Sequence, residues 1–205
     1  EGNDVVSDSD PVVSYTVSFS EPIAGMGGED ITVKGGTLDA GSVVVADGGM
    51  SATFSVTATQ DSVADLTVTI NDTVLDLNGN ILIEDTSDAE TVDTVNPTIT
   101  GIASSFADTN NDDGVVSDDD AVVSYTVSFS EPISGMVDGD ITVNGGTLDA
   151  NSVSVAEGGM LATFSVTATQ DSVADLTVTI NDTVMDVHGN ILIEDTSDAE
   201  TVDTV

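Results

Sequence analysis

The sequence predicts an all-β protein made of two sandwich domains in tandem, and two observations support this prediction. First, hydrophobic and polar residues alternate with a period of two in segments such as "VVSYTVSFS" and "LTVTI". That alternation is typical of strands with one buried face. Second, residues 11–95 align with residues 121–205 without a gap, at a constant offset of 110, and differ at 13 of 85 positions. A repeat of this length indicates a whole domain in each copy.

The repeat divides the chain into a first domain at residues 1–93 and a second at residues 94–205. The joint is predicted in "EDTSDAETVDTVNP", an acidic and turn-rich stretch that ends at Pro97. The first copy lacks a counterpart of "TVNPTITGIASSFADT", residues 94–109. We therefore expect repeat 1 to lack its first strand, and the chain to be a piece of a longer protein.

Each complete repeat is expected to contain about seven strands. In the second copy they are predicted near residues 96–105, 121–130, 140–144, 151–157, 160–168, 175–181 and 190–194 with its extension. In one of them, Val123, Tyr125, Val127 and Phe129 share one face, which predicts that they are buried. Seven short strands in about 110 residues predict an immunoglobulin-like β-sandwich with Greek-key connections. An odd number of strands puts the chain ends at opposite poles, so the domains are expected end to end.

Composition excludes several functions. The chain has 38 Asp and Glu against one Lys, a formal net charge of −37, so it repels nucleic acid and anionic membranes. Hydrophobic residues make up 39% and recur at regular spacing, which favours a folded chain over a disordered one. No apolar run approaches the roughly 20 residues of a membrane helix, so no membrane insertion is expected.

No enzymatic activity is expected either. The chain has no Cys, no Arg, a single His and no G-x-S-x-G motif. A carboxylate-pair glycosidase needs a walled cleft, usually with aromatic platforms, and aromatic residues are only 3% of this chain.

The loop "DTNNDDG", residues 108–114, is the first candidate metal site. Asp108, Asn110 and Asp112 have the 1-3-5 spacing of an EF-hand loop, and Gly114 permits a sharp turn. Asp120 stands near the position of the final carboxylate. Oxygen ligands without cysteine favour calcium over zinc or copper. The alternative is a solvated acidic loop.

A second candidate site comes from loops that strand parity places at one pole of each repeat. Its members are acidic or amide residues that the two copies share: Glu131, Asp140, Asp186 and Asn190 in the second copy, and Glu21, Asp30, Asp76 and Asn80 in the first. Asp93 in the linker is expected to arrive at the same pole of the second repeat, which predicts calcium at the joint. The alternative for "DLNGN" and "DVHGN" is a hairpin turn chosen for the backbone preferences of Gly and Asn, and both interpretations can hold together.

The blocks "SFSEPISGMVDGDITVNGGTL", "DVHGN" and "TVDTVNPTIT" resemble the bacterial immunoglobulin-like repeats of giant surface adhesins. These include the calcium-dependent extender repeats of repeats-in-toxin adhesins. The resemblance covers both copies and implies a β-sandwich in a long cell-surface array that binds calcium at its joints. The "DTNNDDG" loop departs from the family by being one residue longer than the commoner Asp-x-Asn-x-Asp-Gly form.

Three functions remain open. The first is a calcium-rigidified structural extender at the bacterial cell surface, a monomeric rod whose partners are neighbouring repeats of the same chain. The second is a module that binds carbohydrate, ice or a protein, and the third is a salt-adapted domain whose charge serves solubility. Near-identical copies favour the extender, because it gains by repetition and needs no unique pocket. The ligand of the adhesin tip is not encoded in these residues.

Overall fold

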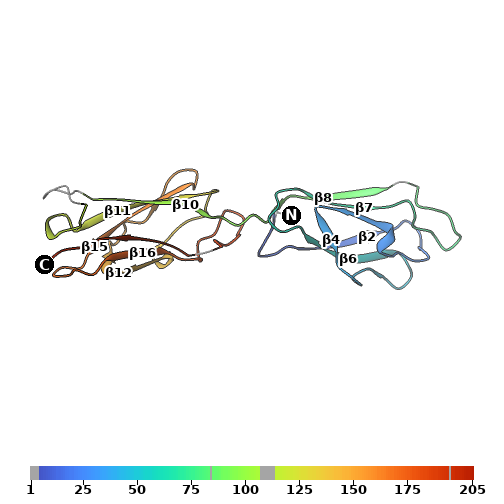
Figure 1. The fold of residues 1–205 in the computed structure, drawn as a ribbon. Coiled ribbons are helices and arrows are strands. Elements are labelled where there is room, and N and C mark those ends of the chain that lie inside the picture. The colour runs from blue at the N-terminus through green and yellow to red at the C-terminus, as the bar shows by residue number, and fades with distance from the viewer. Residues whose placement is uncertain (1–4, 84, 107–113, 194) are drawn as a thin grey trace. The chain divides into compact units, whose positions relative to one another are not determined.

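The computed structural model describes residues 5–83, 85–106, 114–193 and 195–205. The chain divides into two compact units, Glu1–Val95 and Asn96–Val205. The described residues form strands and turns, with helical structure only in three-residue 3-10 turns (Figure 1). The all-β prediction is confirmed.

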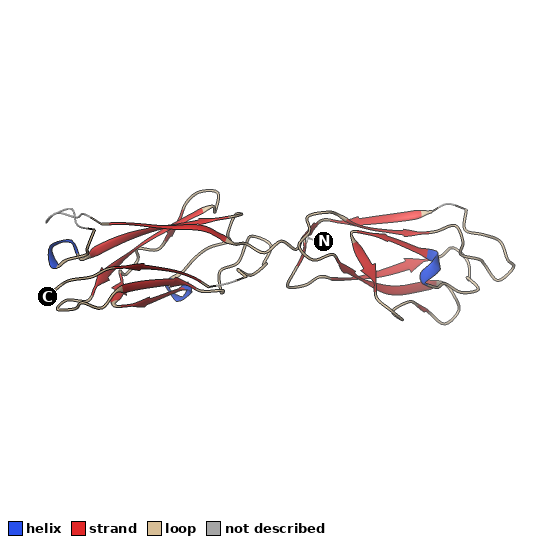
Figure 2. Ribbon diagram, viewed as in Figure 1, coloured by secondary structure: helices blue, strands red, loops and turns tan. Residues whose placement is uncertain are grey.

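Unit 2 is a sandwich of two antiparallel sheets (Figure 2). The first sheet has the order β10 (Ile99–Ser105), β11 (Val122–Phe129), β15 (Leu161–Ala168) and β13 (Gly146–Leu148), and β14 (Ser154–Val155) also pairs with β15. The second has the order β12 (Ile141–Asn144), β16 (Leu176–Ile180) and β17 (Thr196–Glu200). This division matches the ABED and CFG sheets of an immunoglobulin-like domain, as the sequence predicts.

The core of unit 2 lies between these sheets and is built by alternation along the strands. Val123, Tyr125 and Val127 of β11 are fully buried, while the intervening side chains are more exposed. Tyr125 stacks on Phe164 of β15 with ring centroids 5.2 Å apart. The predicted inward face of this strand is therefore correct.

Unit 1 repeats most of this plan. One sheet has the order β2 (Val12–Ser18), β6 (Ser51–Ala58) and β4 (Gly36–Leu38), with β5 (Val44–Val45) also on β6; the other has the order β3 (Ile31–Lys34), β7 (Leu66–Ile70) and β8 (Thr86–Glu90). A short parallel pair joins β1 (Val6–Ser7) to β9 (Val92–Asp93). The described residues of unit 1 include no counterpart of β10, so β2 stands at the edge of its sheet.

The last predicted strand, residues 190–194 with its extension, begins later than expected. Ile191 forms an isolated bridge with Met185, and the final strand is β17, in the extension. Its acidic sequence, "TSDAE", also occurs in β8, within the stretch that the sequence predicts as the joint. β17 pairs with β16 alone, and an edge strand tolerates charged side chains because it needs little apolar burial.

A second difference lies in the middle of the repeat. Gly146–Leu148 forms the short strand β13, which the sequence does not predict because Gly145 precedes it and Gly146 begins it. Gly145 has a φ of +77°, a conformation that glycine adopts without strain. A Cβ on Gly146 would lie 2.6 Å from Cδ1 of Leu176. The glycine pair therefore lets β13 pack closely on the opposite sheet.

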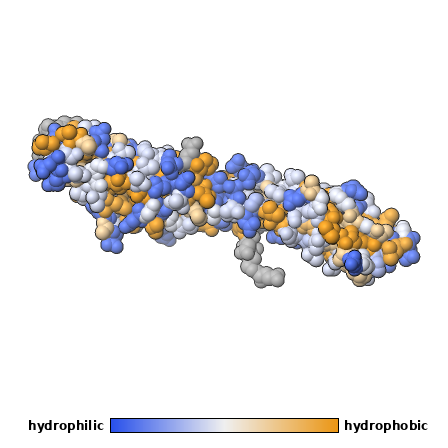
Figure 3. All heavy atoms as spheres, turned by 90° about the horizontal axis from the view of Figure 1, so that it is seen from below, coloured by the Kyte–Doolittle hydropathy of each residue, from blue (hydrophilic) through white to orange (hydrophobic). Residues whose placement is uncertain are grey.

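Hydrophobic residues also reach the surface of both units, between hydrophilic ones (Figure 3). Among the most exposed are Val63, Ile83 and Val173. Single exposed apolar side chains are ordinary in folded proteins, so they do not identify a site by themselves.

Candidate metal centre

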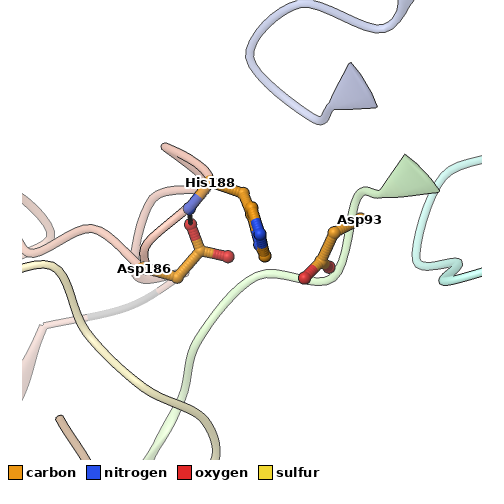
Figure 4. A group of neighbouring side chains, drawn as sticks. All are labelled: Asp93, Asp186 and His188. Carbon is orange, nitrogen blue, oxygen red and sulfur yellow. Dashed lines mark hydrogen bonds between the residues drawn. The ribbon is translucent and has the colours of Figure 1, made fainter. Parts of the chain in front are cut away.

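The turn at residues 186–190 is organised around the carboxylate of Asp186. Oδ1 of Asp186 accepts a hydrogen bond from the backbone N–H of His188 at 2.7 Å (Figure 4). It accepts a second one from the backbone N–H of Asn190 at 2.9 Å. Oδ2 accepts one from Nδ2 of Asn190 at 2.8 Å. Asp186 and Asn190 are 1% and 0% exposed. Asp186 therefore holds a hairpin turn, the alternative that the sequence left open beside metal binding.

Unit 1 contains the same turn. Oδ1 of Asp76 accepts from the backbone N–H groups of Asn78 and Asn80, and Oδ2 accepts from Nδ2 of Asn80 at 2.7 Å. The side-chain hydrogen bond from Asn80, followed by the backbone donors, lowers the pKa of Asp76 below its ordinary value. Asn78 donates to Asp76 through its backbone N–H. His188, the equivalent residue of unit 2, therefore makes the same hydrogen bond to Asp186 despite its different side chain.

Asp140 holds a different turn at the same end of unit 2. It closes the 3-10 turn η3 (Asp138–Asp140), where its Oδ2 accepts from the backbone N–H of Val137 at 2.8 Å. Its Oδ1 accepts from Oγ1 of Thr183 at 2.6 Å, which ties the turn to the chain that follows β16. The backbone N–H of Asn181 also donates to the carbonyl of Asp140.

Asp30 does the same in unit 1, in η1 (Gly28–Asp30). It accepts from the backbone N–H of Gly27 at 2.9 Å and from Oγ1 of Thr73 at 2.6 Å. Gly27 in unit 1 and Val137 in unit 2 each donate to the turn aspartate through the backbone N–H. The hydrogen bond therefore does not depend on which of the two side chains is present. We did not foresee the contribution of Thr73 and Thr183, although "NDTV" is identical in both copies and could have indicated it.

The loop that follows β11, which carries Glu131, is fastened to the turn of Asp186. Ile133 forms a bridge with Asp186, and the backbone N–H of Ser134 donates to the carbonyl of Met185 at 2.9 Å. The structure therefore gathers Glu131, Asp140 and Asp186 at one end of unit 2, which we call its acidic end. The same connections in unit 1, such as the bridge from Ile23 to Asp76, gather Glu21, Asp30 and Asp76 at the acidic end of that unit.

The remaining predicted ligands are Asp108, Asn110, Asp112, Asp120 and Asp93. Asp108, Asn110 and Asp112 fall outside the described residues. Asp120 closes η2 (Asp118–Asp120), where its Oδ1 accepts from the backbone N–H and the hydroxyl of Ser117. Asp93 belongs to β9 of unit 1, and its Oδ1 accepts from the backbone N–H of Val95 at 3.2 Å.

The residue types at each acidic end are those that a hard cation prefers, although the carboxylate oxygens of Glu131, Asp140 and Asp186 do not all lie within 4.8 Å of one another. The side chains offer carboxylate and amide oxygens, the ligands that calcium prefers. Asp186 uses three of the roughly four acceptor positions of a carboxylate, so it retains capacity for a further contact. The chain supplies few cations of its own, since it has only one Lys and no Arg.

Comparison with known protein families finds a match, which falls mainly on the first unit. Residues 4–99 match a family model described as a bacterial Ig-like domain. The match supports bacterial Ig-like repeats. The second copy shares the sandwich and differs from the first at 13 of 85 aligned positions, so the Ig-like fold extends to both units. No match was found among curated proteins.

Several solved structures are similar at low identity. One holds tandem Ig domains of titin, at 9% identity, covering 98% of this chain and 90% of that one, with a TM-score of 0.25. Another is SGBP-B of the Bacteroides ovatus mixed-linkage glucan utilization locus, solved with a heptasaccharide, at 16% identity, 98% and 44% coverage and a TM-score of 0.24. A third is the endo-fucoidan hydrolase MfFcnA4 of glycoside hydrolase family 107, at 15% identity, 98% and 28% coverage and a TM-score of 0.23. Similarities this low carry no argument about function.

The described residues also contain no helix that is both long and apolar enough to cross a membrane.

Proposed function

We propose that these bacterial Ig-like repeats are structural extenders of a large cell-surface adhesin, stiffened by calcium, which hold a ligand-binding tip away from the cell. The observation that carries the proposal is the near-identity of the two repeats over residues 11–95 and 121–205, with 13 differences in 85 aligned positions. Repetition of one plan adds length, whereas a specific pocket is needed only once. The candidate acidic ligands do not change between copies, since Glu21, Asp30 and Asp76 align with Glu131, Asp140 and Asp186.

Calcium has a defined task in this proposal. The acidic end of unit 2 would offer oxygens from Glu131, Asp186 and Asn190, and unit 1 would offer the equivalent oxygens. A chain of net charge −37 repels itself, and one Lys cannot neutralise it. A divalent ion supplies positive charge to carboxylates that are held by neutral N–H donors.

A carbohydrate-binding module is less well supported. Such modules usually present exposed aromatic rings to a sugar. Both tyrosines of this chain face the cores instead, at 9% exposure for Tyr15 and 0% for Tyr125, and each stacks on a phenylalanine. The extender therefore remains the proposal that the side chains support best.

Calorimetric titration with calcium, with magnesium as the control, tests the proposal. We expect saturable calcium binding and a higher melting temperature in calcium than in chelator. Binding to the folded state alone stabilises by about 2.7 kcal/mol at a hundredfold excess over Kd. Light scattering should report a monomer in both conditions.

A pair of variants assigns the effect to the acidic end. Asp186→Ala combined with Glu131→Ala should weaken the calcium response of unit 2 strongly. Asp138→Ala is the matched control, since Asp138 is exposed and copy one has Gly28 at that position. Identical melting curves in calcium and in chelator for the unsubstituted chain would refute the calcium mechanism.

A further inference from the structure

The hairpin of residues 184–192 in unit 2 has two faces of different character. Its arms are joined by backbone hydrogen bonds from the N–H of Asp186 to the carbonyl of Asn190 and from the N–H of Leu192 to the carbonyl of Val184. The side chains of these four residues face inward and are at most 2% exposed. Because side chains alternate along each arm, the residues between them face outward.

Large apolar side chains occupy this outward face. Met185 lies opposite Ile191 in an antiparallel bridge, so their side chains are neighbours. Val187 continues the face toward the tip of the hairpin, and Ile193 continues it toward the base. The exposed fractions of the four side chains lie between 42% and 57%. We call this group the apolar face of the hairpin.

Outward positions on the strands of unit 2 are filled differently. Along β11 and β16, five of them carry hydroxyl side chains: Ser124, Thr126, Ser128, Thr177 and Thr179. Thr favours the strand conformation, as Val and Ile do, and its hydroxyl remains hydrated at the surface. The strand conformation of the hairpin therefore does not require apolar side chains at its outward positions.

Unit 1 carries an equivalent apolar face. Leu75 forms a bridge with Ile81, and Leu77 and Ile83 extend the face in the same way. All four side chains are exposed. Two of the four residue types differ between the units, yet each position keeps a large apolar side chain. In unit 2 the face is exposed with strand β10 in place, so its exposure does not come from the absence of that strand.

Exposed carboxylates stand at the base of each hairpin. In unit 2 the backbone N–H of Asp182 donates to Oδ1 of Asp195 at 2.7 Å, which holds the two aspartates beside the arms. Asp72 and Asp85 repeat this contact in unit 1 at 2.8 Å. The chain has one Lys and no Arg, so these carboxylates favour cationic groups of a partner and repel an anionic lipid surface.

We propose that the apolar face of each hairpin is a docking surface for a polypeptide segment whose aliphatic side chains are flanked by lysine or arginine. The aliphatic side chains of the segment cover the apolar face, and its cations meet the aspartates at the base of the hairpin. The side chains of the apolar face offer no oxygen ligand, whereas Asp186 and Asn190 lie on the inward face of the same turn. The docking surface is therefore independent of calcium and of the extender role.

A synthetic peptide with three leucines between two pairs of lysines tests the proposal on the full chain. Fluorescence anisotropy in the presence of chelator should show saturable binding, whether or not the chain binds calcium. A peptide with serine in place of leucine keeps the charge and removes the apolar contact. It should bind at least about tenfold more weakly, because less apolar surface leaves water. A peptide with glutamate in place of lysine should also bind more weakly, because the aspartates repel it.

Substitutions on the hairpins assign the binding to the apolar face. Val187→Thr with Ile193→Thr in unit 2, combined with Leu77→Thr and Ile83→Thr in unit 1, places hydroxyl groups at outward positions, as on β11. This hairpin variant should bind the leucine peptide at least about tenfold more weakly. Its melting temperature should match that of the unsubstituted chain, because all four side chains are exposed.

Val63→Thr with Val173→Thr is the matched control, since both valines are 69% exposed and lie outside the hairpins. It should leave the affinity for the leucine peptide unchanged. Absence of saturable binding, equal binding of the leucine and serine peptides, or equal weakening by the control variant would each overturn the proposal. So would concentration-dependent dimers that disappear in the hairpin variant, because they would assign the apolar face to a second copy of this chain.

Discussion

Removing two methyl groups from equivalent valines should measure how much strand β10 contributes to unit 2. Val127→Ala and Val17→Ala change the same residue in identical local sequence, on β11 and β2 respectively. Val127 is fully buried beneath its pairing with Ile102, whereas Val17 is only half-buried. The pair therefore isolates the effect of the missing neighbour.

The magnitude follows from burial. Each buried methyl is worth about 0.8 kcal/mol, so Val127→Ala loses about 1.6 kcal/mol of transfer free energy. The cavity that remains in a closed core brings the loss to about 2 to 3 kcal/mol. At Val17 the side chain is already partly solvated and water fills the space, so the loss should be about half as large or less.

Hydrogen exchange in increasing denaturant measures the unfolding free energy of each unit separately in the intact chain. The unsubstituted chain provides the reference, and each variant leaves the other unit as an internal control. We expect unit 1 to be the less stable unit before any substitution. Equal losses of free energy at the two sites, or a larger loss at Val17, would refute the view that β10 makes the difference in burial.

Three further predictions concern the turns and the tyrosines. Asp140→Ala should destabilise unit 2 by about 1 to 2 kcal/mol in denaturant unfolding, because it removes the acceptor for Val137 and Thr183, while Asp138→Ala should have little effect. Burial, with nearby carboxylates adding to it, raises the pKa of Tyr15 to about 12 from 10.0, so the stability of unit 1 should be full below pH 10 and fall between about pH 10 and 12; Tyr15→Phe should abolish that fall. The pKa of Asp76 is lowered, so its contribution is present above its unfolded-state value of 3.8 and is lost as pH falls below it; an acid titration of Asp76→Asn should lack this loss.

The sequence predicts the fold because apolar alternation marks β11, β15 and β16, whose inward side chains form much of the core of unit 2. It failed where a strand contributes little to the core. β17, with the sequence "TSDAE", pairs through its backbone at a sheet edge, and nothing in its side chains distinguishes it from an acidic linker. β13 begins with a glycine whose role depends on the opposite sheet, which only the folded chain reveals.

The sequence predicts which residues form the candidate site, but it does not predict the hydrogen bonds that these residues make. The Asp-x-x-Gly-Asn spacing in each copy indicates a turn, and the structure forms one around Asp76 and Asp186. Which carboxylate oxygens are already occupied depends on tertiary neighbours. Thr183 donates to Asp140 from 43 residues away, and no local pattern predicts that contact.

Charged side chains are distributed unevenly over the edges of the sheets. Exposed strand edges are open to unwanted pairing, and proteins protect them with charged side chains. The edge strand β8 carries Asp88 and Glu90, and β17 carries the equivalent pair. β2 carries no charged residue between Val12 and Ser18, although it stands at an edge in unit 1. Its counterpart β11 is equally uncharged, and there β10 covers it. The edge strands β12 and β13 are also uncharged, so acidic side chains protect only some of the edges, and short strand length limits pairing at the others.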